Sequence, residues 1–408
     1  MELGPVQVAT VILAGGQGTR LHPLTIHHSK PAVAYGGRYR LIDIPISNSI
    51  NSDFRQIFVI AQYLSGELQN HIGETYQPSS VQVLTPKERE RFRGTADAVR
   101  KNLGTLLQSA ADYFLILSGD QLYNINFQQM VAFAQEKRAD LVVAALPVLE
   151  KEAGRMGLLQ TNERAQIVGF VEKPTDPAVL QQFALAESFF QSCQIAPPKE
   201  PSWLGSMGIY VFKREALVEL LHKDQRDDFG YHLIATAVQK GNTFAFVYHG
   251  YWEDIGTIAS YYEANLIMTE ADREGLNTYD ENNPIYARPT YLPGPKIQST
   301  KIIQSIICEG CIIEAEEISH SIIGLRSHIR RGSIIRDTVM MGNHTQDCGV
   351  GENCLIEKAI IDEHVCIGTG VQLINQNKLE RYDGDGIFIR DGIIIVTAGT
   401  VLPDRFVL

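Results

Sequence analysis

The chain has 408 residues, 44% of them hydrophobic and 20% charged, which is enough apolar sequence for two or three packed domains and excludes a disordered chain. Its net charge of −11 argues against binding nucleic acid or an anionic membrane through a broad basic face. No apolar run approaches the ~20 residues of a membrane span, and the N-terminus lacks a secretion-signal pattern. The six cysteines favour reduced thiols over a disulfide scaffold. We therefore expect a cytoplasmic protein.

Short apolar runs alternate with segments of helical spacing from about residue 7 to residue 275. We expect buried parallel strands in five places: 8–16, 57–63, 113–120, 141–148 and 206–212. A helix is expected over 96–111. This alternation predicts an α/β domain with a mostly parallel sheet over residues 1–278, with ligands at the carboxyl ends of its strands.

The pattern changes after residue 278. A Pro-rich linker is expected over 279–296, because residues 282–296 carry four prolines. Over 297–408, pairs of isoleucines recur every five or six residues with Gly, Asn, Asp or Ser between them, beginning with Ile302-Ile303 and Ile306-Ile307. A period near six predicts the hexapeptide coils of a parallel β-helix. The alternative is an ordinary antiparallel β-domain with frequent turns.

The first apolar run leads into a glycine-rich loop, Ala14-Gly15-Gly16-Gln17-Gly18-Thr19-Arg20. Glycines let the backbone turn sharply and direct N–H groups at an anion. The loop matches neither the phosphate loop of NTPases nor the dinucleotide-binding motif. Arg20 follows at once and Lys30 ten residues later, and two cations beside such a loop suit a polyphosphate.

Two aspartates are candidate ligands for Mg²⁺, which prefers carboxylate and phosphate oxygens. Asp120 ends the strand expected at 113–120, and Asp254 lies just before a segment that is helical in pattern from Ile258 onward. Each aspartate has a simpler alternative, which is to cap the helix that follows it. Lys173 follows Glu172 and suits a terminal phosphate, but Glu-Lys-Pro alone is usually a solvated surface turn.

Together these motifs resemble the glucose-1-phosphate adenylyltransferase family, most closely its cyanobacterial and plant branch. The matching segments are AGGQGTRL (14–21), SKPAV (29–33), RLIDIPISNSINSD (40–53), RGTADAV (93–99), LSGDQLY (117–123), FVEKP (170–174), SMGIYVF (206–212), YWEDIGTIASYYEANL (251–266), GLRSHI (324–329) and GENCLIEKAIID (351–362). The resemblance implies a Rossmann-like nucleotidyltransferase domain followed by a left-handed β-helix. It also implies Mg²⁺-dependent formation of ADP-glucose from ATP and glucose 1-phosphate for glycogen or starch synthesis.

The resemblance assigns roles to individual residues. It implies catalytic roles for Arg20, Lys30 and Asp120, and metal ligation by Asp120 and Asp254. The implied ATP-binding residues are Leu13, Gly15, Gly16, Thr19, Arg20, Lys30, Gly94 and Thr95. The implied glucose-1-phosphate residues are Phe92, Gly157, Glu172, Lys173 and Ser206. The family often has Tyr where this chain has Phe92, so Phe92 is equally consistent with packing.

Family members are typically tetramers that anionic metabolites regulate through basic residues, so we expect a homotetramer. Here His27 and His28 stand where a basic pair is expected, and Ala398 stands where a lysine is expected. We expect weak or atypical effector binding at His27, His28 and Arg381. Two other functions are disfavoured: a non-catalytic regulatory subunit, because the charged active-site residues are all present, and a β-helix acyltransferase, because about 110 residues give too few coils. Cys308 and Cys311 have zinc-like spacing, although small apolar positions in β-helix coils explain them more simply.

Overall fold

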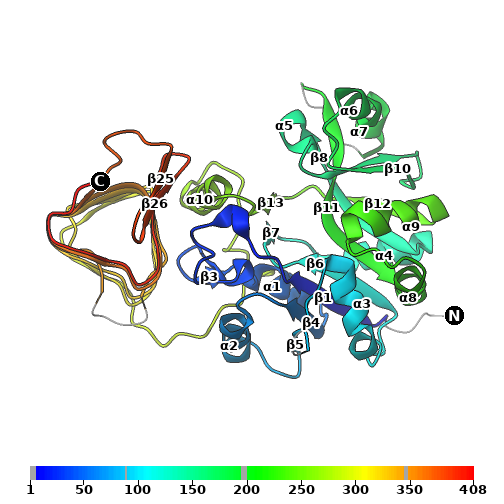
Figure 1. Cartoon of the computed structure of the whole chain (residues 1–408), viewed down its shortest axis with the longest axis horizontal. Helices are drawn as coiled ribbons and strands as arrows, with labels where there is room; N and C mark the ends of the chain where they lie inside the picture. The colour runs from blue at the N-terminus through cyan, green and yellow to red at the C-terminus, as the bar shows by residue number, and fades with distance from the viewer. Residues whose placement is uncertain (1–5, 88–89, 194–199, 344–347) are drawn as a thin grey trace.

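The computed structural model describes residues 6–87, 90–193, 200–343 and 348–408. An α/β part forms one side of the molecule and a three-sided stack of β-strand coils forms the other, with helix α10 (Ile258–Leu266) between them (Figure 1). No helix in these described ranges has the length and apolar character needed to span a bilayer.

A nine-stranded sheet forms the centre of the α/β part, in the order β10-β9-β11-β6-β1-β4-β5, with β8 on β11 and β12 on β8. Its strands are β1 (Val8–Ala14), β4 (Gln56–Ala61), β5 (Val81–Leu84), β6 (Tyr113–Ser118), β8 (Leu141–Leu149), β9 (Gly157–Thr161), β10 (Ile167–Glu172), β11 (Ser202–Lys213) and β12 (Thr243–Val247). The pairings orient β10 and β11 opposite to the others. The predicted mostly parallel sheet is therefore confirmed.

One strand direction was predicted incorrectly. The run 206–212 was expected to be a parallel strand, but it belongs to β11, which runs antiparallel to β6, β8 and β9. A fully buried antiparallel strand and a parallel one share the same continuous apolar pattern, so composition does not distinguish them. The register of β11 shifts between Ser206 and Tyr210.

Helices cover both faces of the sheet (Figure 1). One apolar core includes residues of α1 (Asp43–Asn51), α2 (Ser65–Thr75), α4 (Phe127–Lys137) and α10. The other includes residues of α3 (Thr95–Leu106), α8 (Arg214–Lys223) and α9 (Ala235–Lys240). The remaining helices are α5 (Glu150–Ala153), α6 (Pro177–Phe183), α7 (Glu187–Cys193), the π-helix η3 (Phe229–Ile234) and the 3₁₀ turns η1 (Thr19–Leu21), η2 (Lys30–Ala32) and η4 (Ile267–Thr269). The helix expected over 96–111 is α3, which ends five residues earlier.

The tail forms a parallel β-helix, so the antiparallel alternative is wrong for its coils. Ile297 pairs with Ile313 and Ile313 with Ile329, so one coil takes 16 residues, about three sides of five or six each. Its interior is aliphatic, with Ile318, Ile335 and Ile356 fully buried. The strands are β14 (Lys296–Ile297), β15 (Lys301–Ile303), β16 (Ile306–Ile307), β17 (Ile312–Ile313), β18 (Glu317–Ser319), β19 (Ile322–Ile323), β20 (His328–Ile329), β21 (Ile334–Met340), β22 (Leu355–Ile361), β23 (Cys366–Ile367), β24 (Gln372–Leu373), β27 (Ile393–Val396) and β28 (Val401–Leu402).

An antiparallel insertion interrupts the last coils. Strand β25 (Arg381–Asp383) pairs antiparallel with β26 (Ile387–Arg390), which pairs antiparallel with β27. From β26, the Phe388 ring meets the His22 ring edge-on at 5.7 Å between centroids. The insertion therefore reaches the loop that follows the glycine-rich segment.

Two cysteines differ from the expectation of reduced thiols. Cys348 and Cys366 form a disulfide, with their Cα atoms 4.5 Å apart. The pairing depends on the register of the coils, which 18 residues of sequence separation do not reveal. Cys308, Cys311 and Cys354 are free and buried.

Candidate active site

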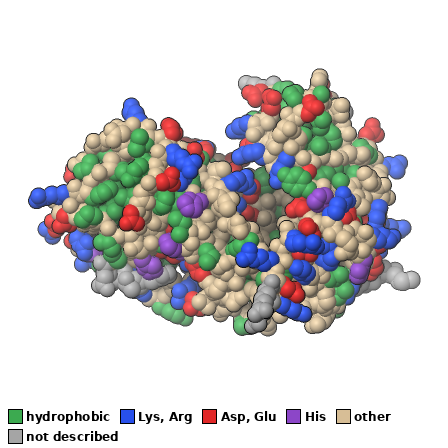
Figure 2. Space-filling view, viewed as in Figure 1, with side chains coloured by type: hydrophobic (Ala, Val, Ile, Leu, Met, Phe, Trp, Pro, Cys, Tyr) green, Lys and Arg blue, Asp and Glu red, His purple; other side chains and the backbone are tan. Residues whose placement is uncertain are grey.

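A cavity of about 590 Å³ opens in the α/β part, where β1, β4 and β6 end. Figure 2 shows this part of the molecule hollowed near its centre, over the region where Figure 1 labels β11 and β13. Twelve of the fifteen residues expected to bind ATP, sugar phosphate or metal line the cavity. They are Leu13, Gly15, Gly16, Arg20, Lys30, Phe92, Gly94, Thr95, Asp120, Glu172, Lys173 and Asp254.

The glycine-rich loop positions two cations at the cavity. Gly18 has a φ of +65°, and a Cβ there would lie 2.9 Å from the Lys30 Cβ, so only glycine allows the two segments to approach this closely. Lys30 lies in η2, where its Nζ is 2.5 Å from Asp120 Oδ2. The Arg20 guanidinium passes Gly256, 3.6 Å from where a Cβ on that glycine would lie.

Asp120 and Asp254 face the same cavity from paired strands. Asp120 follows β6, and β7 (Gln121–Tyr123) pairs antiparallel with β13 (Trp252–Asp254) so that Gln121 lies opposite Asp254. Neither aspartate caps a helix: β7 follows Asp120, and Thr257 caps α10 by accepting from the Ser260 N–H. The helix-cap alternatives are therefore wrong.

The environments of the two carboxyls pull their pKa values apart. Burial alone would raise the pKa of Asp120, but the Lys30 ammonium and the Ser118 hydroxyl, which donates at 2.5 Å, lower it overall. Burial, followed by the charge of Asp120, raises the pKa of Asp254. Two carboxylates that repel each other across a cavity are hard oxygen donors, and a divalent cation would relieve that repulsion.

Glu172 and Lys173 extend the cavity from the end of β10. Lys173 Nζ lies 3.5 Å from Glu172 Oε1 and 5.2 Å from the Tyr231 ring centroid. Burial raises the pKa of Glu172, while Lys173 opposes that rise. A Cβ on Gly157 would lie 2.7 Å from Glu172 Oε2, so Gly157 makes room for that carboxylate. Lys173 thus lies at the cavity and not in an isolated surface turn.

The start of α3 closes another side of the cavity. A Cβ on Gly94 would lie 2.3 Å from the backbone oxygen of Asp227. Thr95 Oγ1 donates to Asp228 Oδ2 at 3.1 Å and accepts from the Phe229 N–H at 2.9 Å. The Thr95 hydroxyl therefore connects the start of α3 to residues 228 and 229 on this side of the cavity. Phe92 faces the cavity and also packs against the second core.

Three expected residues lie off the cavity lining: Thr19, Gly157 and Ser206. Ser206 Oγ instead accepts from the Gly208 N–H at 3.3 Å. Several further residues line the cavity and were not predicted from the sequence, among them Gln62, Ser118, Gln121, Tyr210 and Asp228. Gln62 directly follows β4, so the expectation that ligands lie at the carboxyl ends of parallel strands could have identified it. Asp228 follows no strand, and no sequence signal marked it.

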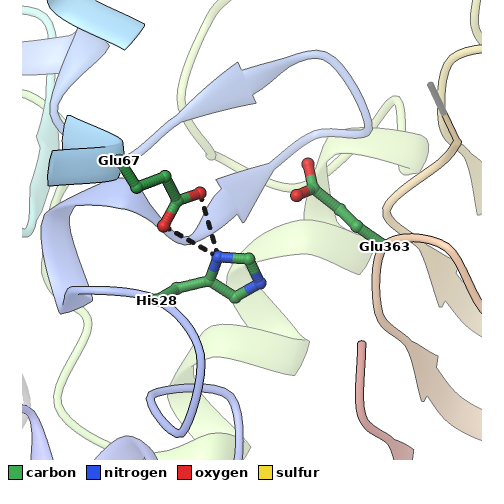
Figure 3. A group of neighbouring side chains, drawn as sticks. All are labelled: His28, Glu67 and Glu363. Carbon is green, nitrogen blue, oxygen red and sulfur yellow. Dashed lines mark hydrogen bonds and ion pairs between the residues drawn. The ribbon is translucent and has the colours of Figure 1, made fainter. Parts of the chain in front are cut away.

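His28, one of the residues expected to bind an effector, has two carboxylate partners in the structure. It is buried, and its Nδ1 lies 3.0 Å from both oxygens of Glu67 (Figure 3). Its Nε2 lies 3.6 Å from Asp362 Oδ1. Burial opposes its protonation, but Asp362 and Glu67 together raise the pKa of His28 to about 10. A charged imidazole already held by two carboxylates is poorly placed to bind an anionic effector.

The other two expected effector residues do not join His28. His27 is exposed, and Arg381 pairs with Asp383 at 3.4 Å on the antiparallel insertion. Across the described ranges, no hydrogen bond or ion pair connects Arg381 with either histidine. The three residues therefore lie in different environments, and effector binding at them stays a prediction.

Metal-binding groups elsewhere are few. Within the described residues, one cluster brings three ligand atoms within 4.8 Å of one another, namely His28, Glu67 and Glu363 (Figure 3). Arg40 already pairs with both of its carboxylates, so ion pairs account for the cluster. The Cys308 and Cys311 thiols lie against the backbone oxygens of Gly36 and Gly324 and belong to no such cluster. The zinc reading is not supported.

Two family comparisons cover most of the chain. Residues 9–271 match the family described as nucleotidyl transferase. Residues 290–407 match the domain described as the GLGC left-handed parallel beta-helix domain. The first match contains every element of the nine-stranded sheet except the first residue of β1, and the second contains all the coils.

Proposed function

Because the chain belongs to the nucleotidyl transferase family, we propose that it is a glucose-1-phosphate adenylyltransferase, which converts ATP and α-D-glucose 1-phosphate to ADP-glucose and diphosphate. One observation carries the proposal: a single cavity gathers Arg20, Lys30, Asp120, Lys173 and Asp254. The match of the tail to the GLGC β-helix domain supports it. The product would supply glycogen or starch synthesis.

The proposed reaction is a direct transfer. An oxygen of the sugar phosphate attacks the α-phosphorus of ATP and forms a new P–O bond. The bond from the α-phosphorus to the bridging oxygen breaks, and diphosphate leaves with that electron pair. The nucleophile is already an anion, so the cavity needs no strong base. Its residues bring two anions together in line and neutralise the charge on the leaving group.

The two substrates would occupy opposite sides of the cavity. We assign ATP to the glycine-rich loop with Arg20 and Lys30, because backbone N–H groups and two cations suit a triphosphate. We assign the sugar phosphate to Lys173 and the sugar hydroxyls to Glu172, because a carboxylate accepts hydrogen bonds from hydroxyls.

Asp120 and Asp254 fit a divalent cation, and Mg²⁺ held by them would neutralise phosphate charge at the reacting centre. The raised pKa of Asp254, which the Asp120 charge helps to cause, is the observation that favours a cation here. Asp120 would also keep Lys30 directed into the cavity through their ion pair.

The proposal also covers the regulation of the protein and its assembly into oligomers. We propose a cytoplasmic homotetramer whose activation by anionic metabolites is weak, because His28 is committed to Glu67 and Asp362. The charged residues that a catalytic member of the family needs all line the cavity, which weighs against a non-catalytic subunit. They are Arg20, Lys30, Asp120, Lys173 and Asp254. The β-helix of about 110 residues is short for an acyltransferase, which needs more coils for its acyl donor.

The test is diphosphate release with glucose 1-phosphate, Mg²⁺ and each nucleoside triphosphate in turn. We expect diphosphate release with ATP to exceed release with GTP, CTP or UTP. Equal release with every triphosphate would contradict adenylyl specificity, and release with none would contradict the proposed activity.

A further inference from the structure

The segment that carries Lys30 is tied to the β-helix on both of its sides. Two residues before Lys30, the buried imidazole of His28 faces Asp362. Two residues after Lys30, the backbone oxygen of Ala32 accepts a hydrogen bond from Arg40 Nη1. Lys30 thus lies midway between two contacts that fix the backbone of η2.

Both contacts lead to the same short stretch of the β-helix. Asp362 and Glu363 directly follow β22, and Arg40 Nη2 lies 3.3 Å from Glu363 Oε1. Glu67 of α2 completes the group, 3.0 Å from His28 Nδ1 and 3.0 Å from Arg40 Nη1. Three carboxylates therefore surround two cations on either side of η2.

The β-helix holds Asp362 in place for this contact. The Asp362 N–H donates to the Val396 oxygen at 2.9 Å, and the Ala398 N–H donates to Asp362 Oδ2 at 3.2 Å. Asp362 is 2% exposed, and Arg40 and Glu363 side chains are 13% exposed each. Ion pairs shielded from water in this way are less screened than surface pairs.

We propose that His28 and Arg40 are positioning residues, and that Asp362 and Glu363 use them to clamp η2 so that Lys30 reaches the active-site cavity. The inference rests on the proposed function in one respect, which is the assignment of Lys30 to the nucleotide. Through this clamp the β-helix contributes to catalysis without contributing a residue to the cavity.

The main test is Asp362→Asn, which keeps the side-chain shape and removes the charge. We expect kcat to fall and KM for ATP to rise, together lowering kcat/KM for ATP by about 10-fold, while KM for glucose 1-phosphate changes less than twofold. Asp404→Asn is the matched control, because Asp404 Oδ1 also accepts a backbone N–H inside the β-helix, from Thr369 at 2.8 Å. Asp404→Asn should change neither kcat/KM for ATP nor KM for glucose 1-phosphate.

A second arm separates positioning from general destabilisation. In a Lys30→Gln background, Asp362→Asn should have no further effect on kcat/KM for ATP, because its effect passes through Lys30. Additive losses, or equal rises in both KM values, would overturn the clamp. Arg40→Lys, which keeps the charge but not the two-sided contact, should lie between the wild type and Asp362→Asn.

Amide hydrogen exchange gives a readout that does not need activity. We expect faster exchange in residues 29–33 in Asp362→Asn and unchanged exchange there in Asp404→Asn. Unchanged exchange in Asp362→Asn would overturn the clamp, whatever the kinetics. Faster exchange in a chain whose wild type makes no ADP-glucose would support the clamp and contradict the proposed function.

Discussion

Asp120 meets a cation on one oxygen and a hydroxyl on the other, from Lys30 and Ser118. Both contacts favour the ionised carboxylate, which is the form that binds a metal. The Asp120 carboxylate is therefore held charged and in one orientation at the cavity.

Replacing Asp120 by Asn keeps the shape and removes the charge. We predict that kcat falls by ~10²-fold or more, because a preorganised charge at the reacting centre is lost. Initial rates under saturating substrates and Mg²⁺ measure this. Asp53→Asn is the control, since Asp53 is exposed and pairs only with Arg55 among the described residues. Near-normal turnover in Asp120→Asn would remove Asp120 from the catalytic set.

Lys173→Ala tests the division of the cavity between two substrates. We predict that KM for glucose 1-phosphate rises roughly 10- to 150-fold, the equivalent of ~1.5–3 kcal/mol for one charge-assisted contact, while KM for ATP stays nearly constant. Lys213→Ala is matched in exposure, with side chains 46% and 49% exposed. An equal rise in both KM values would show that the assignment of Lys173 to glucose 1-phosphate is wrong.

Residues at the ends of apolar strands could be predicted from sequence. Asp120 and Gly15 follow runs whose burial is evident from composition, and parallel strands bring such ends together. His28 could not be predicted in this way. Its partners Glu67 and Asp362 lie 39 and 334 residues away, and nothing distinguishes His28 from its neighbour His27 except that packing turns one of them inward.

At the scale of elements, ion pairs connect α2, η2 and the end of β22. His28 is the cation among them whose charge changes near neutral to alkaline pH. Facing His28 are Glu67 from α2 and Asp362 from the end of β22, with Arg40 and Glu363 beside them. The pKa of His28 is raised from 6.5 to about 10. The stability that this protonation contributes is complete below pH 6.5 and is lost as the pH rises through about 10.

We predict that His28→Gln lowers the melting temperature most near pH 6, and that its difference from the wild type narrows steadily toward pH 10. Thermal unfolding followed by circular dichroism at half-unit intervals measures this. His27→Gln, at an exposed position, should follow the wild type throughout. A constant difference across the range, or one that widens at high pH, would contradict the assignment of a charged His28.

Element types were more predictable than element directions. The isoleucine period predicted the coils because each side of a β-helix must direct an aliphatic residue inward, as Ile313 and Ile329 do. The antiparallel insertion β25–β26 was not predicted, because it breaks that period in the last coils. The direction of β11 depends on its sheet partners and has no signature within the strand itself.

At the scale of the whole molecule, the first coils of the β-helix leave apolar edges open. Ile297, Ile302 and Ile303 are between 36% and 44% exposed on strands β14 and β15. Exposed strand edges and apolar end coils need covering. These coils are therefore candidate contacts between copies of the chain.

We predict that the chain sediments as a homo-oligomer, most simply a tetramer, at micromolar concentration. Ile302→Asp should shift sedimentation toward smaller species, because a charge would be buried in the contact. Val168→Asp, at a position 59% exposed in the α/β part, is the control and should leave the distribution unchanged. A wild type that sediments only as a single chain would refute the prediction.

We propose that one cavity joins a nucleotide to a sugar phosphate, and product analysis tests this most directly. Purified protein with ATP, glucose 1-phosphate and Mg²⁺ should form ADP-glucose and diphosphate in equal amounts, and removal of the metal by a chelator should stop both. Asp120→Asn should lose both products together. Diphosphate without ADP-glucose, or neither product from the wild type, would contradict it.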